Sequence, residues 1–289
     1  MSNASLEKSM SLRMHSYAQT NVQLFNQLRS EGYSKQEIER VSQAYQFAIQ
    51  LFTGLFLPSG KTFIDHLVGT ASVLASLHAP VELVTAGLIH AAYLHGNFGG
   101  LRKGISATTR THVRLAVGAE VEEYVVRYER MPWNPKFFPL LRDTLDELSP
   151  IDRDVLLMRL ANDLEHNLDR GSLYRDNWRE YIQHAGPAMV SMAEQLGFPS
   201  LSAEMASVFG DMVLAEVPVE ARIRTSEPAA YLIVPKSYQE RFWVVYMRKA
   251  HRFCFAILNA LRRLRWKCSR FIRGLLRALS EMPKVHGHK

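Results

Sequence analysis

The stretch from Val81 to Leu94 constrains the fold most, because it is apolar all around a helix. A helix without a polar face is typical of the centre of a helical bundle. Neighbouring segments repeat apolar residues at the i, i+3, i+4 spacing of an amphipathic helix. We find no strand-like alternation longer than a few residues, except at 231–234. The sequence therefore predicts an all-α fold.

Start and stop signals divide the first 216 residues into helices. Ser34 and Glu37 match a capping box, in which each side chain bonds the other residue's backbone N–H. Ser106 and Gly118 mark the two ends of another helix, and Ser149 begins a helix over 151–169. Proline and glycine predict loops at 54–61, 95–104 and 132–139.

Charge separates the chain into a body and a tail. Residues 236–289 carry 14 Lys and Arg against 2 Asp and Glu, whereas residues 1–235 carry 21 against 26. The basic character thus belongs to the tail, and the body has no overall attraction for nucleic acid. We expect a helical domain over 1–216, a Pro-containing linker over 217–236 and a long basic amphipathic helix over 237–289.

Other features limit the cellular setting. Two cysteines cannot build a disulfide framework or a thiolate zinc site. The first residues do not form a secretory signal, and no window holds the roughly 18 apolar residues of a membrane-spanning helix. We expect a cytoplasmic protein, and the tail adds the hypothesis of peripheral membrane association.

The tail alternates apolar and aromatic residues with arginines at near-helical spacing. A basic amphipathic helix with tryptophans favours an anionic membrane surface or an acidic protein partner. Nucleic acid is a weaker alternative, because the apolar stripe is large. A further alternative is that the stripe packs on the acidic body. The residues proposed to bind the membrane or partner are Trp243, Arg262, Arg263, Arg265, Trp266, Arg270 and Arg273.

Three patterns place candidate metal ligands inside apolar helices. They are 63–67 with His66, 86–92 with His90, and 159–167 with Asp163 and His166. Imidazole nitrogens and carboxylate oxygens suit divalent Mn, Fe or Zn. An ionisable group on a buried helix face also needs a partner, which a metal would supply.

In order and spacing these patterns resemble the HD superfamily of metal-dependent phosphohydrolases, most closely the hydrolase domain of RelA/SpoT-type alarmone enzymes. The likeness spans about residues 37–168. It rests on Ser59–Gly60, Phe63–His66, Gly87–His90, Gly118–Val121 and Arg159–Asn167. The resemblance implies an HD-type helical bundle with His66 and His90 as metal ligands.

The chain departs from that family at its defining Asp, which is Ala91 here. Two acidic positions that serve the attacking water are Leu94 and His95, and His95 offers a replacement ligand or a general base. The last family Asp aligns with Asn162 on the Leu-Ala dipeptide or with Asp163 on the Asp-x-x-His-Asn spacing. The second alignment matches three polar positions and favours Asp163 as the third ligand.

Three functions stay open at this point. One is a divergent HD protein with a degenerate metal site that acts as a binding, regulatory or scaffold module. Another is an atypical metal-dependent phosphohydrolase, in which Asn167, Arg102 and Lys103 contact substrate and His95 is catalytic. The third is a protein-interaction module driven by the tail. The basic residues missing at 55–58 argue against guanosine tetraphosphate as substrate, and Arg110, His112 and Arg114 form either an anion-binding patch or a solvated face.

Overall fold

The computed structural model describes residues 17–99, 104–174, 177–216, 231–233 and 247. The chain divides into two compact units, residues 1–233 and 234–289. The helices and strands named below all belong to the first unit. Its described residues confirm the predicted all-α fold, with two strands of two residues each beside the helices.

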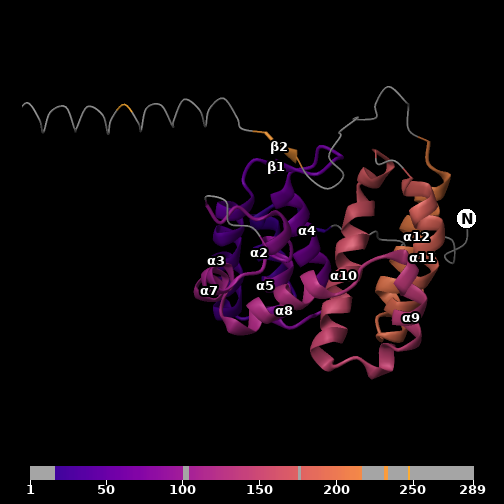
Figure 1. The fold of residues 1–289 in the computed structure, drawn as a ribbon, viewed down its shortest axis with the longest axis horizontal. Coiled ribbons are helices and arrows are strands. Elements are labelled where there is room, and N and C mark those ends of the chain that lie inside the picture. Colours follow the sequence, from indigo (N-terminus) through magenta and orange to yellow (C-terminus); the bar gives the residue numbers. More distant parts are fainter. Residues whose placement is uncertain (1–16, 100–103, 175–176, 217–230, 234–246, 248–289) are drawn as a thin grey trace, which may run out of the picture. The chain divides into compact units, whose positions relative to one another are not determined.

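Helices α4, α6, α8 and α10 form the part of the bundle that carries the candidate site. Figure 1 shows α4 and α10 side by side, with α11 and α12 beyond α10. The helices are α2 (Asn21–Ser30), α3 (Lys35–Phe52), α4 (Phe63–Ser76), α5 (Val81–Gly87), α6 (Ala92–His95), α7 (Ala107–Val117), α8 (Ala119–Arg130), α9 (Phe138–Asp143), α10 (Pro150–Leu168), α11 (Trp178–Gln195) and α12 (Pro199–Leu214). Short 3-10 turns cover Pro135–Phe137, Leu145–Glu147 and Gly171–Tyr174.

The helix ends follow the local signals in the sequence. Ser34 caps α3, with Glu37 completing the capping box. Ser106 caps α7, and Ser149 caps α10 with Pro150 in its first turn. Gly118 separates α7 from α8 at a φ of 92°, a left-handed conformation that glycine adopts at little cost. These limits were predictable because each depends on residues only a few positions apart.

The prediction of one continuous helix from Val81 to Leu94 is wrong. Helix α5 ends at Gly87, and α6 begins only at Ala92. Between them the backbone forms tighter i to i−3 hydrogen bonds, such as that from Ile89 N to Ala86 O. His90 lies in this turn, and its Nδ1 donates to the Gly87 carbonyl at 2.8 Å. The His90 side chain therefore hydrogen-bonds a backbone carbonyl at the C-terminal end of α5.

The predicted loop at 54–61 contains a strand instead. Residues 55–56 form β1 (Leu55–Phe56), which pairs antiparallel with β2 (Tyr231–Leu232). The pairing places Leu55 opposite Leu232 and extends to a 3.0 Å bond from Ile233 N to Gly54 O. Pairing satisfies backbone groups that a loop would leave to water. Part of the segment predicted as a linker thus belongs to the first unit.

Several predicted features lie outside the described residues. They are the tail residues Trp243, Arg262, Arg263, Arg265, Trp266, Arg270 and Arg273, and the candidate substrate contacts Arg102 and Lys103. Within the part of the chain that the structure describes, no helix has the length and apolar character needed to cross a membrane.

Candidate functional site

A pocket of about 380 Å³ lies where α4, α6, α8 and α10 meet. Four imidazoles line it, those of His66, His90, His95 and His166. His66, His90 and His95 were predicted as ligands or catalytic groups, and the structure brings these three residues together around one pocket. The remaining lining residues are Leu57, Phe63, Ala91, Leu94, Tyr128, Glu129, Met131, Trp133, Arg159 and Asn162.

The imidazole of His66 is held in place by a hydrogen bond to a carboxylate. Its side chain is 1% exposed, and its Nδ1 hydrogen-bonds to Oε2 of Glu165 on α10. Its ring stacks on that of His166, with centroids 4.1 Å apart and planes 26° from parallel. The ring of His90 meets it edge-on, at 5.4 Å. A histidine bonded through Nδ1 to a carboxylate is fixed in orientation, as ligating and catalytic histidines commonly are.

Glu165 is fully buried and was not among the predicted site residues. Its Oε1 forms an ion pair with Lys61, which also lies 3.4 Å from Asp169. Burial raises the pKa of Glu165, and the opposing effects of Lys61 and His166 do not cancel that rise. Gly69 makes room for the carboxylate, because a Cβ there would lie 2.5 Å from Oε1. In the sequence, the only indication of a role for Glu165 is that this ionisable residue follows Leu164 on a helix with a buried face.

His90 and His95 occupy different environments. His90 is 3% exposed, and its ring lies 4.8 Å from that of Tyr128. Burial, followed by the proximity of His66, lowers the pKa of His90 well below its usual 6.5, so this imidazole is neutral at pH 7. His95 is half-buried, and its ring lies 5.3 Å from that of Phe63.

The structure separates Asn162 from Asp163. Asn162 lines the pocket, and its buried Oδ1 has no hydrogen-bond partner among the described residues. Asp163 is not part of the lining, and its oxygens accept hydrogen bonds from Trp133 Nε1 at 2.7 Å and Tyr181 OH at 3.1 Å. Asn167 lies outside the lining as well and donates to the Asp163 backbone carbonyl. Of the two candidate positions for the third ligand, the structure thus places Asn162 in the pocket lining and Asp163 outside it.

The donors do not fit the divalent metal that the resemblance implies. In the alignment that the resemblance implies, Ala91 and Asn162 stand at the two carboxylate positions, and the pocket lining offers four imidazoles with Glu129 as its one carboxylate, whose pKa burial raises. Ligand atoms of His66, Glu165 and His166 do lie within 4.8 Å of one another. Both Glu165 oxygens are already bonded, however, to Lys61 and His66. The nearly parallel rings of His66 and His166 would also point their lone pairs alongside each other, and not at one ion.

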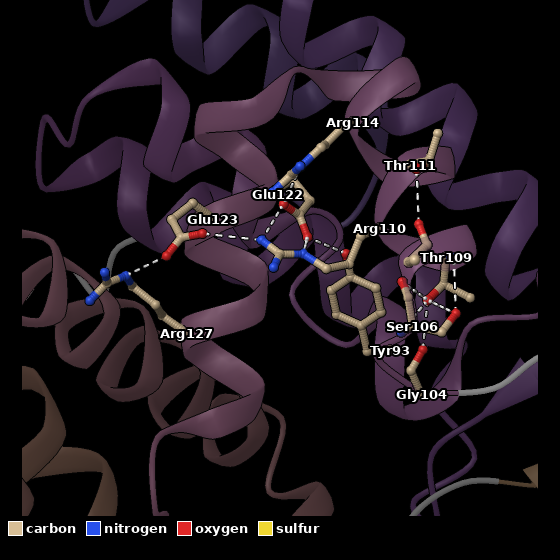
Figure 2. Close-up of polar contacts among 11 residues, drawn as sticks. Tyr93, Gly104, Ser106, Thr109, Arg110, Thr111, Arg114, Glu122, Glu123 and Arg127 are labelled. Atoms are coloured by element: carbon tan, nitrogen blue, oxygen red, sulfur yellow. Dashed lines mark hydrogen bonds and ion pairs between the residues drawn. The ribbon is translucent and has the colours of Figure 1, made fainter.

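A second buried carboxylate lies away from the pocket. Glu122 accepts hydrogen bonds from Arg110 Nε at 2.7 Å, Arg114 Nε at 2.8 Å and Tyr93 OH at 2.6 Å (Figure 2). The two arginines of the predicted basic patch are therefore engaged in the fold. The third member, His112, packs against aromatic rings with centroids 5.6 and 5.7 Å away.

Comparison with known families gives one match. Residues 53–132 match a family model described as a domain of unknown function (DUF6817). The chain is similar to that family over β1 to α8, a segment that includes His66, His90, His95 and Tyr128. No curated protein matches the chain. The resemblance to the HD superfamily stays a prediction.

Proposed function

We propose that this protein is a small-molecule-binding module, built on an HD-like bundle that no longer performs metal-dependent hydrolysis. One observation carries the proposal. The pocket has a volume of about 380 Å³ and is lined by four histidines, while the alignment with the HD superfamily puts Ala91 and Asn162 at the positions of the carboxylate ligands. What is missing is the charge that a hydrolytic metal needs, and what remains is a cavity suited to a ligand.

The charge balance supports this proposal. A divalent ion that activates water needs ligands that hold it firmly while leaving a position open. Here the ion would enter a pocket whose lining includes the cation of Arg159 and a single carboxylate, Glu129. Uncompensated charge in a partly buried site is costly, so such a site would bind a metal weakly.

The runner-up is an atypical metal-dependent phosphohydrolase using His66, His90 and Asp163. The cluster of His66, Glu165 and His166 favours some metal affinity. That alternative requires Glu165 to leave Lys61 or Asp163 to leave Trp133. A function driven by the basic tail stays a prediction, because the tail lies outside the described residues.

Metal content tests the proposal. The full chain, purified without chelator and dialysed against Mn, Fe or Zn, should retain well under one ion per chain by elemental analysis. The variant Ala91→Asp/Asn162→Asp restores both carboxylates, and we expect it to gain metal. About one ion per wild-type chain, lost in His90→Ala, together with metal-dependent cleavage of bis(p-nitrophenyl) phosphate, would contradict the proposal and support the hydrolase.

A further inference from the structure

We propose that Arg159 is the anchor for the anionic group, a carboxylate or a phosphate, of a small planar ligand in this pocket. The inference rests on the proposed function, because it names the class of molecule that the binding module takes. It comes from the charges on the pocket wall and from two polar side chains that the fold leaves incompletely bonded.

Arg159 carries a charge that the described residues do not pair. It lies half-buried on α10, its Nη2 donates to the backbone carbonyls of Tyr128 and Met131, and a further hydrogen bond joins it to the Tyr128 side chain. Its Nε is buried without an acceptor. Lys61 and Arg110, by contrast, both reach buried carboxylates. A guanidinium withdrawn from water generally has an anionic partner.

The nearby carboxylates do not supply that partner. Asp163 is bonded to Trp133 and Tyr181. Glu129 lines the same pocket, and the charge of Arg159 lowers its pKa, but burial raises that pKa more, and the two side chains form no ion pair in the described structure. The charge of Glu165 is compensated by its ion pair with Lys61. The pocket side of Arg159 is thus left for an anion brought by the ligand.

The aromatic residues that line the pocket indicate the shape of the rest of the ligand. The guanidinium carbon of Arg159 lies 3.6 Å from the centroid of the Tyr128 ring and covers that face, while Trp133 and Phe63 add two further aromatic side chains to the lining. Aromatic walls favour a flat apolar body. Asn162, one turn along α10, also lines the pocket, and its Oδ1 is buried without a hydrogen-bond partner among the described residues.

A purely structural role for Arg159 makes a different prediction. The side chain bonds carbonyls at the end of α8, where a cation also meets the negative end of the helix dipole. If that were its whole role, its removal would lower stability without changing any preference for charged ligands. Selectivity for charge is therefore the decisive measurement.

The test compares three ring compounds that differ in charge: benzoate, phenyl phosphate and the neutral benzamide. Binding to the full chain is followed by calorimetry. We expect at least one anion to bind about tenfold or more tightly than benzamide. Arg159→Met should abolish that preference, and Arg159→Lys, which keeps the charge, should retain part of it. Arg153→Met is the matched control, since Arg153 lies on the same helix in an exposed pair with Asp146.

Comparing benzoate with phenyl phosphate also identifies which anionic group the pocket binds. Tighter binding of benzoate indicates a carboxylate ligand, and tighter binding of phenyl phosphate indicates a phosphate ligand. Equal binding of benzamide, binding of neither anion, or a preference that survives in Arg159→Met would overturn the inference. If Arg159→Met does not fold, a weakened preference in Arg159→Lys supports the inference, because lysine keeps the charge but not the planar guanidinium, and an undiminished preference contradicts it. Metal binding in the earlier experiment would contradict the proposed function alone, so the two failures are distinguishable.

Discussion

Two glutamates of this bundle are completely buried, and their surroundings differ. Glu122 is held by two guanidinium groups and a tyrosine hydroxyl, and it connects α7 and α8 with Tyr93 on α6 (Figure 2). Glu165 has one ammonium group, from Lys61, and one imidazole, from His66. The first carboxylate lies away from the pocket, and the second lies directly behind its wall.

The difference appears in the pKa values. Burial raises the pKa of Glu122, but hydrogen bonds from Arg110, Tyr93 and Arg114 lower it more, so the net pKa is below 4.5. For Glu165 burial is the larger effect, and the net pKa is above 4.5. A fully bonded carboxylate stabilises the fold as an anion, whereas a partly compensated one is maintained at an energetic cost. We infer that Glu165 is retained because it orients His66.

Glu122→Gln should have the largest effect on stability. Glutamine keeps the size of the side chain and removes the charge that two arginines share. Breaking a buried ion pair leaves uncompensated charge, so we expect a loss of about 3 kcal/mol in the free energy of unfolding, measured by chemical denaturation. Glu120→Gln, on the exposed face of the same helix, should change it by less than about 0.5 kcal/mol. A small loss for Glu122→Gln would remove the contrast between the two carboxylates.

Gly69→Ala should have an intermediate effect, because it tests the room made for Glu165. The new methyl would lie 2.5 Å from Oε1 and 2.7 Å from Cγ of a carboxylate that is buried and cannot swing into solvent. We expect a loss of about 1–3 kcal/mol in the free energy of unfolding.

The matched control for that variant is Gly210→Ala. A Cβ at this exposed position of α12 would meet no atom within 4 Å. Alanine is the better helix former, so this change should stabilise the protein by about 0.5–1 kcal/mol. Equal effects at the two glycines would show that the carboxylate adjusts freely, and the proposed orientation of His66 would then lose its basis.

The sequence predicted the helix ends from local contacts and three residues of the candidate site from the family resemblance. Caps at Ser34 and Ser106 depend on contacts within four residues, so local patterns contain all the information required. His66, His90 and His95 were selected by the resemblance and lie around one pocket. The break after Gly87 was not predictable from apolar periodicity, because it involves a bond from the His90 side chain to the backbone.

The remaining site residues depend on contacts between distant parts of the chain. Lys61 pairs with Glu165 across 104 positions, and no local pattern connects them. The choice between Asn162 and Asp163 is made by Trp133, 30 positions away, which bonds the aspartate outside the pocket lining. Matching polar residues in an alignment favoured Asp163, because an alignment carries no information on which face of α10 meets that tryptophan.

The smallest expected effect is a pair of opposite pH dependences. The pKa of Glu122 is lowered in the folded protein, so the stability it contributes is present above about pH 4.5 and is lost as the pH falls through its folded value. The pKa of Glu165 is raised, so its contribution is present below about pH 4.5 and is lost as the pH rises through its folded value. The difference in unfolding free energy between wild type and Glu122→Gln should therefore fall as the pH drops below about 4.5, whereas the difference for Glu165→Gln should fall as the pH rises above about 4.5. Subtracting the unfolding free energy of each variant from that of wild type at the same pH cancels the titration of groups that both proteins share. If the two differences changed with pH in the same direction, both carboxylates would be held as anions in the same way.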